Sequence, residues 1–178
     1  MGSSIIKHLG DFERCNPRKA IRCRQKVKIS GQSGLKLRGV EALASMLIDT
    51  HGPGTVIIHA GANDIGNLKG HQWKQKIEEI AKNLKSRYPR VLFVWSDMVP
   101  RLDYRNHNTK QAEKKRRRYQ RVAREAFLKE GGTWVTHPIM QIDRSLLCWD
   151  EVHHNDEGHN QLLRDFEQFI ASIEGAPH

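Results

Sequence analysis

The chain has 178 residues, enough for one domain with a hydrophobic core, and we expect residues 1–178 to fold as a single domain. Hydrophobic residues make up 38% of the chain and charged residues 28%, a balance that excludes an intrinsically disordered protein. With 30 Lys and Arg against 20 Asp and Glu, the formal net charge of +10 favours an anionic partner or surface.

Two features of the composition bear on cellular setting and cofactors. No apolar run approaches the roughly 20 residues that span a bilayer, and residues 1–10 lack the apolar core of a secretory signal. We therefore expect an intracellular, cytoplasmic protein. Cys15, Cys23 and Cys148 have no metal or redox spacing and are expected to be free thiols. The histidines that follow Cys148 fit no zinc pattern either, so no metal or other cofactor is expected.

The first third of the chain predicts one helix–turn–strand–helix succession. A small-residue turn at Gly2-Ser3-Ser4 leads into an apolar stretch that opens a helix within residues 2–9, and Asn16-Pro17 marks a turn. Residues 27–29 alternate apolar and basic side chains, which predicts a short strand. After a glycine-containing turn at 31–34, apolar residues recur at helical spacing over 35–50, and Gly52-Pro53-Gly54 ends this unit.

Residues 55–66, TVIIHAGANDIG, are the clearest strand-to-loop transition in the chain. The apolar run predicts a strand at Val56–His59 that is buried on both faces, as in a parallel sheet, with His59 as a hydrogen-bonded core histidine. Ligands of open α/β sheets bind at the carboxyl ends of such strands, which makes Asn63 a candidate site residue. The simpler alternative is that Asn63 and Asp64 only form a turn or cap a helix.

The rest of the chain alternates helices with strands. Helices are predicted over 72–87, 109–130 and 156–173, and strands over 90–96 and 133–137, with a loop at 97–108 and an irregular segment at 140–154. This alternation predicts an α/β fold with a parallel sheet and helices on both of its faces.

Four short blocks carry polar groups suited to chemistry: Gly2-Ser3-Ser4, Ser33-Gly34, Gly61–Asp64 and Asp150–His153. They supply a hydroxyl, a glycine amide, an amide side chain and an Asp/His pair whose members, three residues apart, can share a face. Each block also has a plainer interpretation: a serine near a terminus is usually solvated, and an Asp/His pair can be a loop ion pair.

Taken together, the four blocks resemble those of the SGNH (GDSL-like) hydrolases, a family of lipases, esterases and acyl-hydrolases. The third block, Gly-x-Asn-Asp, and the last, Asp-x-x-His, match without exception, and the resemblance covers essentially the whole chain. It implies a three-layer α/β/α, flavodoxin-like fold. It also implies hydrolysis of a carboxylic ester, of a small or lipid-like substrate, through an acyl-enzyme.

The resemblance assigns a role to each matching residue. Ser4 is the implied nucleophile, His153 its general base and Asp150 the residue that orients His153, a Ser-His-Asp triad. The backbone N–H groups of Ser4 and Gly34 and the side-chain amide of Asn63 are the implied oxyanion hole. Trp149, beside Asp150, is a candidate wall of the acyl pocket.

The first block departs from the family in two ways. Ser3 stands where the family has Asp, and the strand that normally precedes the nucleophile is missing or truncated in this sequence. More narrowly, residues 56–65 together with Val94–Ser96 and Pro100-Arg101 are similar to SGNH-like domains of vertebrate retroelement-type reading frames.

A basic run offers a second functional hypothesis. Five consecutive cations lie in the predicted helix over 109–130: Lys114, Lys115, Arg116, Arg117 and Arg118. They form either a solvated helix face or a contact for nucleic acid without sequence specificity. The alternative function is therefore a hydrolase-like basic module that binds nucleic acid and has little or no catalytic activity.

Overall fold

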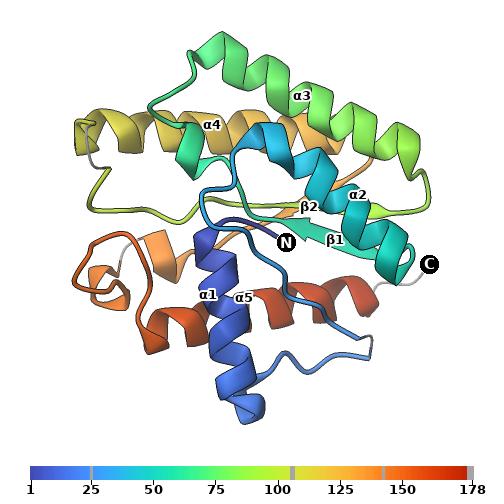
Figure 1. Cartoon of the computed structure of the whole chain (residues 1–178), viewed down its shortest axis with the longest axis horizontal. Coiled ribbons are helices and arrows are strands. Elements are labelled where there is room, and N and C mark those ends of the chain that lie inside the picture. Colours follow the sequence, from blue (N-terminus) through green and yellow to red (C-terminus); the bar gives the residue numbers. More distant parts are fainter. Residues whose placement is uncertain (25, 105–106, 142, 176–178) are drawn as a thin grey trace.

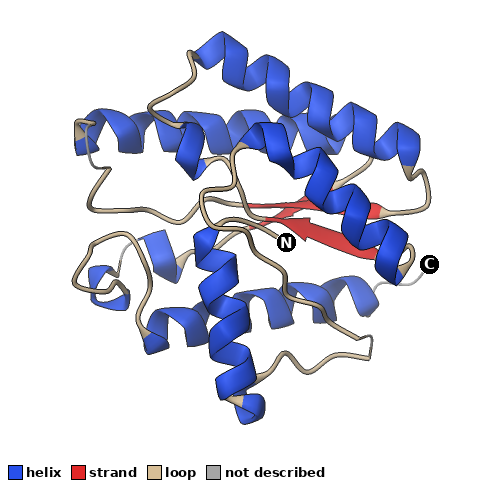
Figure 2. Ribbon diagram, in the orientation of Figure 1, coloured by secondary structure: helices blue, strands red, loops and turns tan. Residues whose placement is uncertain are grey.

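The computed structural model describes residues 1–24, 26–104, 107–141 and 143–175. Within these residues a parallel sheet of order β1–β2–β3 is formed by β1 (Thr55–Ile58), β2 (Leu92–Ser96) and β3 (Thr133–Val135). Helices lie on both sides of this sheet, so the chain has the predicted α/β architecture (Figure 2).

The helices form two outer layers (Figure 1). On one side lie α2 (Val40–His51), α3 (Gly70–Arg87) and α4 (Thr109–Lys129); on the other lie α1 (Ser4–Cys15) and α5 (Asp156–Glu174). Short 3₁₀ helices occupy Pro17–Lys19, Leu37–Gly39, Ala62–Asp64, Ile139–Gln141 and Arg144–Leu146. In the described part of the chain, no helix is both long and apolar enough to cross a membrane.

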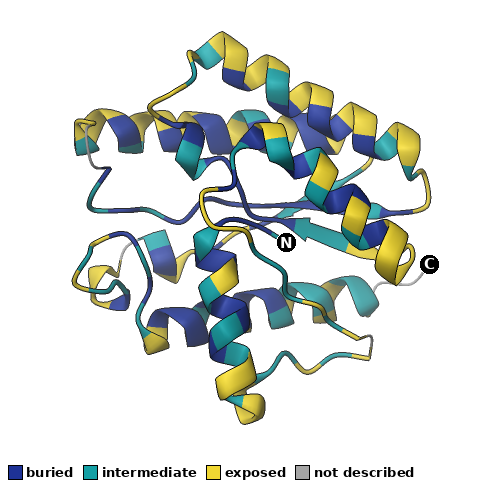
Figure 3. Cartoon of the chain, in the orientation of Figure 1, coloured by how far each residue is buried: buried dark blue, intermediate teal, exposed yellow. Residues whose placement is uncertain are grey.

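Each helix layer packs its apolar stripe onto one face of the sheet (Figure 3). Phe93 and Trp95 of β2 join the core shared with α2, α3 and α4, whereas Val94 between them joins the core shared with α1 and α5. Successive strand residues point to opposite faces, so this alternation buries β2 from both sides. Because both faces of β2 are buried, its sequence is apolar almost throughout.

Most predicted elements lie within a few residues of the observed ones, but the second helix begins later than predicted. We predicted a helix from residue 35, and α2 begins at Val40 after a 3₁₀ turn. The backbone N–H of Leu37 donates to Oδ2 of Asp64 at 2.9 Å. This bond ties residues 35–39 to the loop after β1 and keeps them out of the helix.

The strand predicted at residues 27–29 does not form. Instead a single parallel bridge joins Gly31 to Gly2, and a second joins Gly2 to His59. The backbone N–H of Gly2 donates to Ser30 O at 3.0 Å, and Gly2 O accepts from the N–H of Gln32 at 2.9 Å. Met1 and Gly2 thus lie between the segment 30–32 and His59, with backbone pairing on both sides.

A groove of about 730 Å³, lined by both apolar and charged side chains, continues from Met1 between residues 26–29 and β1. Its lining includes Ile29, Ile57 and, from α5, Phe166 and Ile170. Among the described residues, no β-strand pairs with residues 26–29 or with the edge of β1 that faces the groove. The groove is therefore suited to hold an additional parallel strand.

Four β-branched residues placed before Met1 (Val-Ile-Val-Val) are expected to raise the thermal midpoint of unfolding, because they would fill this groove and extend both ladders. The gain is expected to be about 5 °C or more. Differential scanning calorimetry measures it, with a Gly-Ser-Gly-Ser extension as the matched control. Equal midpoints for the two extensions would contradict this interpretation of the groove.

Candidate active site

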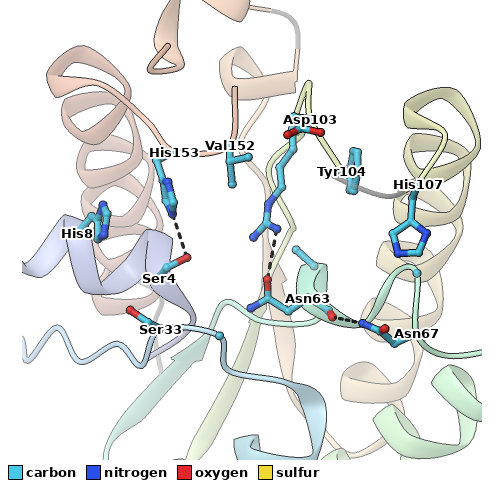
Figure 4. Close-up of a pocket in the computed structure, with 14 residues that line it drawn as sticks. Ser4, His8, Ser33, Asn63, Asn67, Asp103, Tyr104, His107, Val152 and His153 are labelled. Atoms are coloured by element: carbon cyan, nitrogen blue, oxygen red, sulfur yellow. Dashed lines mark hydrogen bonds between the residues drawn. The ribbon is translucent and has the colours of Figure 1, made fainter. Parts of the chain in front are cut away.

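Three residues that the sequence marked as a triad lie in one hydrogen-bonded line. Oγ of Ser4 lies 3.2 Å from Nε2 of His153, and Nδ1 of His153 lies 2.6 Å from Oδ2 of Asp150. Ser4 and His153 are 149 residues apart in sequence and meet only because α1 and the loop before α5 share this side of the sheet (Figure 4). The arrangement is a hydroxyl next to an imidazole whose other nitrogen contacts a carboxylate.

The Asp150 carboxylate is fixed by its own loop. Its Oδ1 accepts from the backbone N–H groups of Val152 at 3.1 Å and His153 at 2.9 Å. Burial by itself raises the pKa of this carboxyl, but the two backbone donors and the His153 ring outweigh burial and hold the pKa at about 2. Asp150 is therefore ionised at neutral pH and favours a proton on Nδ1 of His153, which leaves Nε2 as an acceptor toward Ser4.

Ser4 is the first residue of α1, directly after the N-cap residue Ser3. N–H groups in the first turn of a helix have no intrahelical acceptor and carry the positive end of the helix dipole. Ser3, which stands in place of the expected Asp, is 3% exposed and makes no side-chain cap bond. The turn is held by its backbone instead, through the N–H of Ser3 to His59 O at 3.3 Å.

The loop after β1 places Asn63 across the cavity from Ser4 (Figure 4). Gly61 starts this loop with φ +97°, and a Cβ there would come within 3.1 Å of Trp73, so only glycine fits without strain. Nδ2 of Asn63 donates to Leu35 O at 3.0 Å, and its Oδ1 accepts from Nη1 of Arg101 at 3.3 Å. The amide is thus held in one orientation. One hydrogen of Nδ2 is bonded to Leu35 O, and Nδ2 carries a second hydrogen that can donate to another acceptor.

The neighbouring Asp64 has a structural part in this loop. It is 4% exposed, and besides the bond from Leu37 its environment includes the charges of Lys36 and Arg38. Burial raises the pKa of this carboxyl, although the Leu37 N–H and the two cations oppose the rise. Of the two polar residues in the block, Asn63 lines the cavity and Asp64 holds the loop of residues 35–39 against it.

A cavity of about 500 Å³ opens over these groups. Its lining includes Ser4, Gly34, Asn63 and His153. Gly34 has φ +70° and no atom within 4 Å of a Cβ built on it, so it shapes the turn and leaves the cavity open on its side. Asp150 stands behind His153 and is not part of the lining.

His8 and Arg101 are among the lining residues to which our sequence interpretation gave no part in the site. His8 lies one helical turn after Ser4, and its ring stacks on that of His153. Arg101, which is 9% exposed, contacts the Asn63 side chain as described above. The i, i+4 spacing from Ser4 on a predicted helix was the available signal for His8, whereas the contact of Arg101 depends on how two loops fold together.

Two predicted site residues lie elsewhere than expected. Trp149 is 95% exposed and outside the cavity lining, so it is not a wall of the pocket. The loop closes on itself through Cys148 N–H to His153 O at 2.8 Å, and Trp149 is left on its outer side.

Arg116, assigned to the basic run, is 1% exposed and pairs through Nη2 with Oε2 of Glu113 at 2.8 Å. It falls on the buried stripe of α4 and cannot contact a nucleic acid.

A second Ser–His–Asp line lies in the core and was not foreseen. Oγ of Ser96 lies 2.8 Å from Nε2 of His137, whose Nδ1 lies 2.9 Å from Oδ2 of Asp165. Nδ1 of His59 lies 2.8 Å from the same Ser96 oxygen, which confirms His59 as a hydrogen-bonded core histidine. Ser96 and His137 are 0% exposed, so no substrate reaches them in this structure. We interpret this line as a polar network that joins strand ends to α5.

The buried histidines are expected to make stability depend on pH. Burial, together with the positive charges of His159 and Arg101, lowers the pKa of His154 to about 3, and burial also lowers the pKa of His59 well below its usual value. Such a histidine is neutral when folded but takes up a proton in the unfolded chain below about pH 6.5. Its contribution to stability is therefore complete above that pH and is lost progressively as the pH falls toward 3.

Urea unfolding at pH 7.5 and pH 5.0 tests this expectation. The free energy of unfolding is expected to fall by up to about 1.4 kcal/mol per pH unit for each such histidine. His154→Gln should flatten the pH dependence, whereas His51→Gln, at an exposed position, should leave it unchanged. Equal stability at the two pH values would contradict the expectation.

Comparison with solved structures shows which fold this is. The chain is similar to a GDSL-like lipase from Bacteroides thetaiotaomicron, with a TM-score of 0.74, 17% identity, and coverage of 97% of this chain and 86% of that one. It is also similar to a member of the lipolytic G-D-S-L family from Veillonella parvula, with a TM-score of 0.71, 13% identity, and coverage of 96% and 95%. A third similar structure is a family 3 carbohydrate esterase from Clostridium thermocellum, with a TM-score of 0.68, 16% identity, and coverage of 98% of this chain and 96% of that one.

These similarities show that the chain has the SGNH (GDSL-like) hydrolase fold, as its sequence blocks implied. Within the described residues the sheet has three strands, and Gly2 adds parallel bridges to Gly31 and His59 beside it. Searches with protein-family models and among curated protein sequences found no match.

Proposed function

We propose that this protein is a serine esterase that cleaves a carboxylic ester through an acyl-enzyme. The observation that carries the proposal is the contact of Ser4 Oγ with His153 Nε2, at 3.2 Å, on the lining of a cavity. A serine hydroxyl is a weak nucleophile and needs a base within hydrogen-bond reach. The buried Ser96 has the same type of partner but no access to a substrate.

In the first half-reaction, Ser4 Oγ attacks the carbonyl carbon of the ester while Nε2 of His153 accepts the hydroxyl proton. The carboxylate of Asp150 stabilises the imidazolium that forms. The carbonyl oxygen becomes an oxyanion, for which the N–H groups of Ser4 and Gly34 and the second amide hydrogen of Asn63 are the proposed donors. When the tetrahedral intermediate collapses, the bond to the alcohol breaks and His153 returns its proton to the leaving oxygen.

In the second half-reaction, water attacks the acyl group on Ser4 with His153 again as the base. The bond to Ser4 Oγ then breaks, and the carboxylic acid is released. These steps use only Ser4, His153, Asp150 and the proposed oxyanion donors, and the mechanism includes no cofactor. The structural relatives are named as a lipase and a carbohydrate esterase, which supports an ester bond as the bond that is cleaved.

Pre-steady-state hydrolysis of p-nitrophenyl acetate tests the proposal. We expect a burst of p-nitrophenol equal to the enzyme concentration, followed by slower turnover, because acylation releases the phenol before water removes the acetyl group. Assays with the butyrate ester and with acetylated sugars cover other alcohols and acyl lengths. The absence of hydrolysis above the buffer rate for every one of these esters would refute the proposal.

A second candidate function rests on the exposed face of α4. Lys114, Lys115, Arg117 and Arg118 are all exposed. Among the described residues, the ion pairs of α4 use Arg116, Arg121 and Arg124 instead of these four cations. We propose that this face attracts nucleic-acid phosphates without sequence specificity, a role independent of the esterase site. The buried Arg116 is not part of it.

Binding of a fluorescent 20-nucleotide single-stranded RNA at 50–300 mM salt tests this second role. Changing the four α4 cations to Ala is expected to reduce the slope of log K against log salt by about 3, since each phosphate contact contributes about 0.7 for a single strand. The matched control removes four exposed cations from the region of α3: Lys74, Lys82, Arg87 and Arg90. Equal slopes for the two variants would refute a binding face on α4.

A further inference from the structure

The ring of His8 covers one face of the His153 ring. Their centroids lie 4.7 Å apart, and the ring planes differ by 20°, which is a stacked arrangement (Figure 4). His8 reaches this place because it follows Ser4 by four residues on α1, so the two side chains project from the same side of the helix. Both His8 and His153 line the cavity.

The hydrogen bonds of His153 do not by themselves fix its ring. They lie in the ring plane, at Nδ1 toward Asp150 and at Nε2 toward Ser4, on opposite sides of the imidazole. The ring can still swing by rotation about the Cβ–Cγ bond of His153, because the two hydrogen bonds bend easily. A second ring packed flat on one face opposes that swing and keeps Nε2 directed at the Ser4 hydroxyl.

The charges around His8 suit a neutral stacking partner. Burial lowers the pKa of His8, and the positive charges of His153 and Lys7 lower it further, against the opposing carboxylates of Asp11 and Asp150. From α5, His159 also interacts with His8. A neutral His8 places no like charge against His153 when that ring takes up the Ser4 proton.

We propose that His8 is a positioning residue for His153: it holds the base in the plane needed to accept the Ser4 proton. The proposal rests on the esterase function proposed above. In this proposal His8 affects catalytic turnover only through the His153 ring and does not contact the reacting atoms.

Steady-state kinetics of three variants test the proposal. His8→Ala is expected to lower kcat by about 10- to 100-fold with little change in KM, since small misplacements of a catalytic group have effects of this size. His8→Phe keeps a flat ring and is expected to restore kcat to within about threefold of the original protein. Arg14→Ala, at an exposed position of α1, is the control and should retain full activity. A Phe variant as slow as the Ala variant, or an Ala variant as fast as the original protein, would overturn the proposal.

A measurement that needs no turnover separates this proposal from the esterase function. Nitrogen-15 NMR of the His153 ring is expected to show one tautomer with narrow signals in the original protein and in His8→Phe. The same signals should be broadened or averaged in His8→Ala. Unchanged signals in His8→Ala would refute the positioning role, whether or not the protein hydrolyses esters. Absence of hydrolysis with the expected NMR changes would refute only the proposed function.

Discussion

Ser4→Ala is expected to lower kcat/KM for p-nitrophenyl acetate by at least about 10³-fold, because removal of the nucleophile leaves only binding and the oxyanion donors. The substitution removes one hydroxyl from a half-exposed helix start and should leave the fold intact. Steady-state assays with purified protein measure the loss, and circular dichroism verifies the fold.

The control for this experiment is the second serine with a histidine and an aspartate, Ser96. Ser96→Ala is expected to retain hydrolysis within a few-fold of the original protein. It should also lower the free energy of unfolding by about 1–3 kcal/mol, because His59 and His137 would each lose a buried partner. The opposite pattern, with activity lost in Ser96→Ala and kept in Ser4→Ala, would assign catalysis to the core network.

Asp150→Asn is expected to lower kcat by about 10⁴-fold with little change in KM. The Asn Oδ1 can still accept the two backbone N–H groups that Asp150 accepts, so the loop should keep its shape. Its amide nitrogen, however, would face Nδ1 of His153 as a donor. Nδ1 would then have to be unprotonated, and the proton would lie on Nε2, where it blocks acceptance from Ser4.

Glu151→Gln is the matched control for this loop, since Glu151 is an exposed neighbour that also loses one carboxylate charge. It should leave kcat unchanged. A decrease of less than about tenfold in Asp150→Asn would show that His153 does not depend on Asp150 for its tautomer.

The parts of this fold that local pattern determines were predicted correctly. The apolar runs predicted as strands at residues 90–96 and 56–59 form parallel strands, and helical spacing located α3, α4 and α5 within a few residues. Burial on both faces is confirmed for β2, whereas in β1 Thr55 is exposed and Val56 and Ile57 are only partly buried. In each case the same side chains that define the pattern also make the core. His59 was likewise placed in the core from its position on an apolar strand.

Where contacts between residues distant in sequence decide the structure, local pattern predicted less of it or predicted it wrongly. Residues 35–39 have helical spacing, but the Leu37 N–H bonds to Asp64, 27 residues away. Residues 27–29 have strand character, but a strand needs a neighbour, and the pairing partner Gly2 meets the chain at Gly31 instead. The Ser96–His137–Asp165 network combines β2, the loop after β3 and α5, and no spacing in the sequence joins these three residues.

Arg116 was within reach of prediction. It lies three residues before Tyr119 and seven before Ala123, both on the buried stripe of α4, so its place on the buried face follows from helical periodicity. A charged side chain tolerates that place because Glu113, one turn earlier, neutralises it. The hypothesis of a basic run treated the five consecutive cations as one surface and so overlooked the burial of Arg116. Consecutive residues of a helix point in different directions, so they do not share one face.

The most direct test of the central proposal is to locate the adduct of a fluorophosphonate by peptide mass spectrometry. This reagent phosphonylates a serine that a neighbouring base has activated. We expect one adduct per chain on Ser4, absent from Ser4→Ala and still formed on Ser4 in Ser96→Ala. An adduct on Ser96, or no adduct in the folded original protein, would contradict the proposal that Ser4, His153 and Asp150 form the active site.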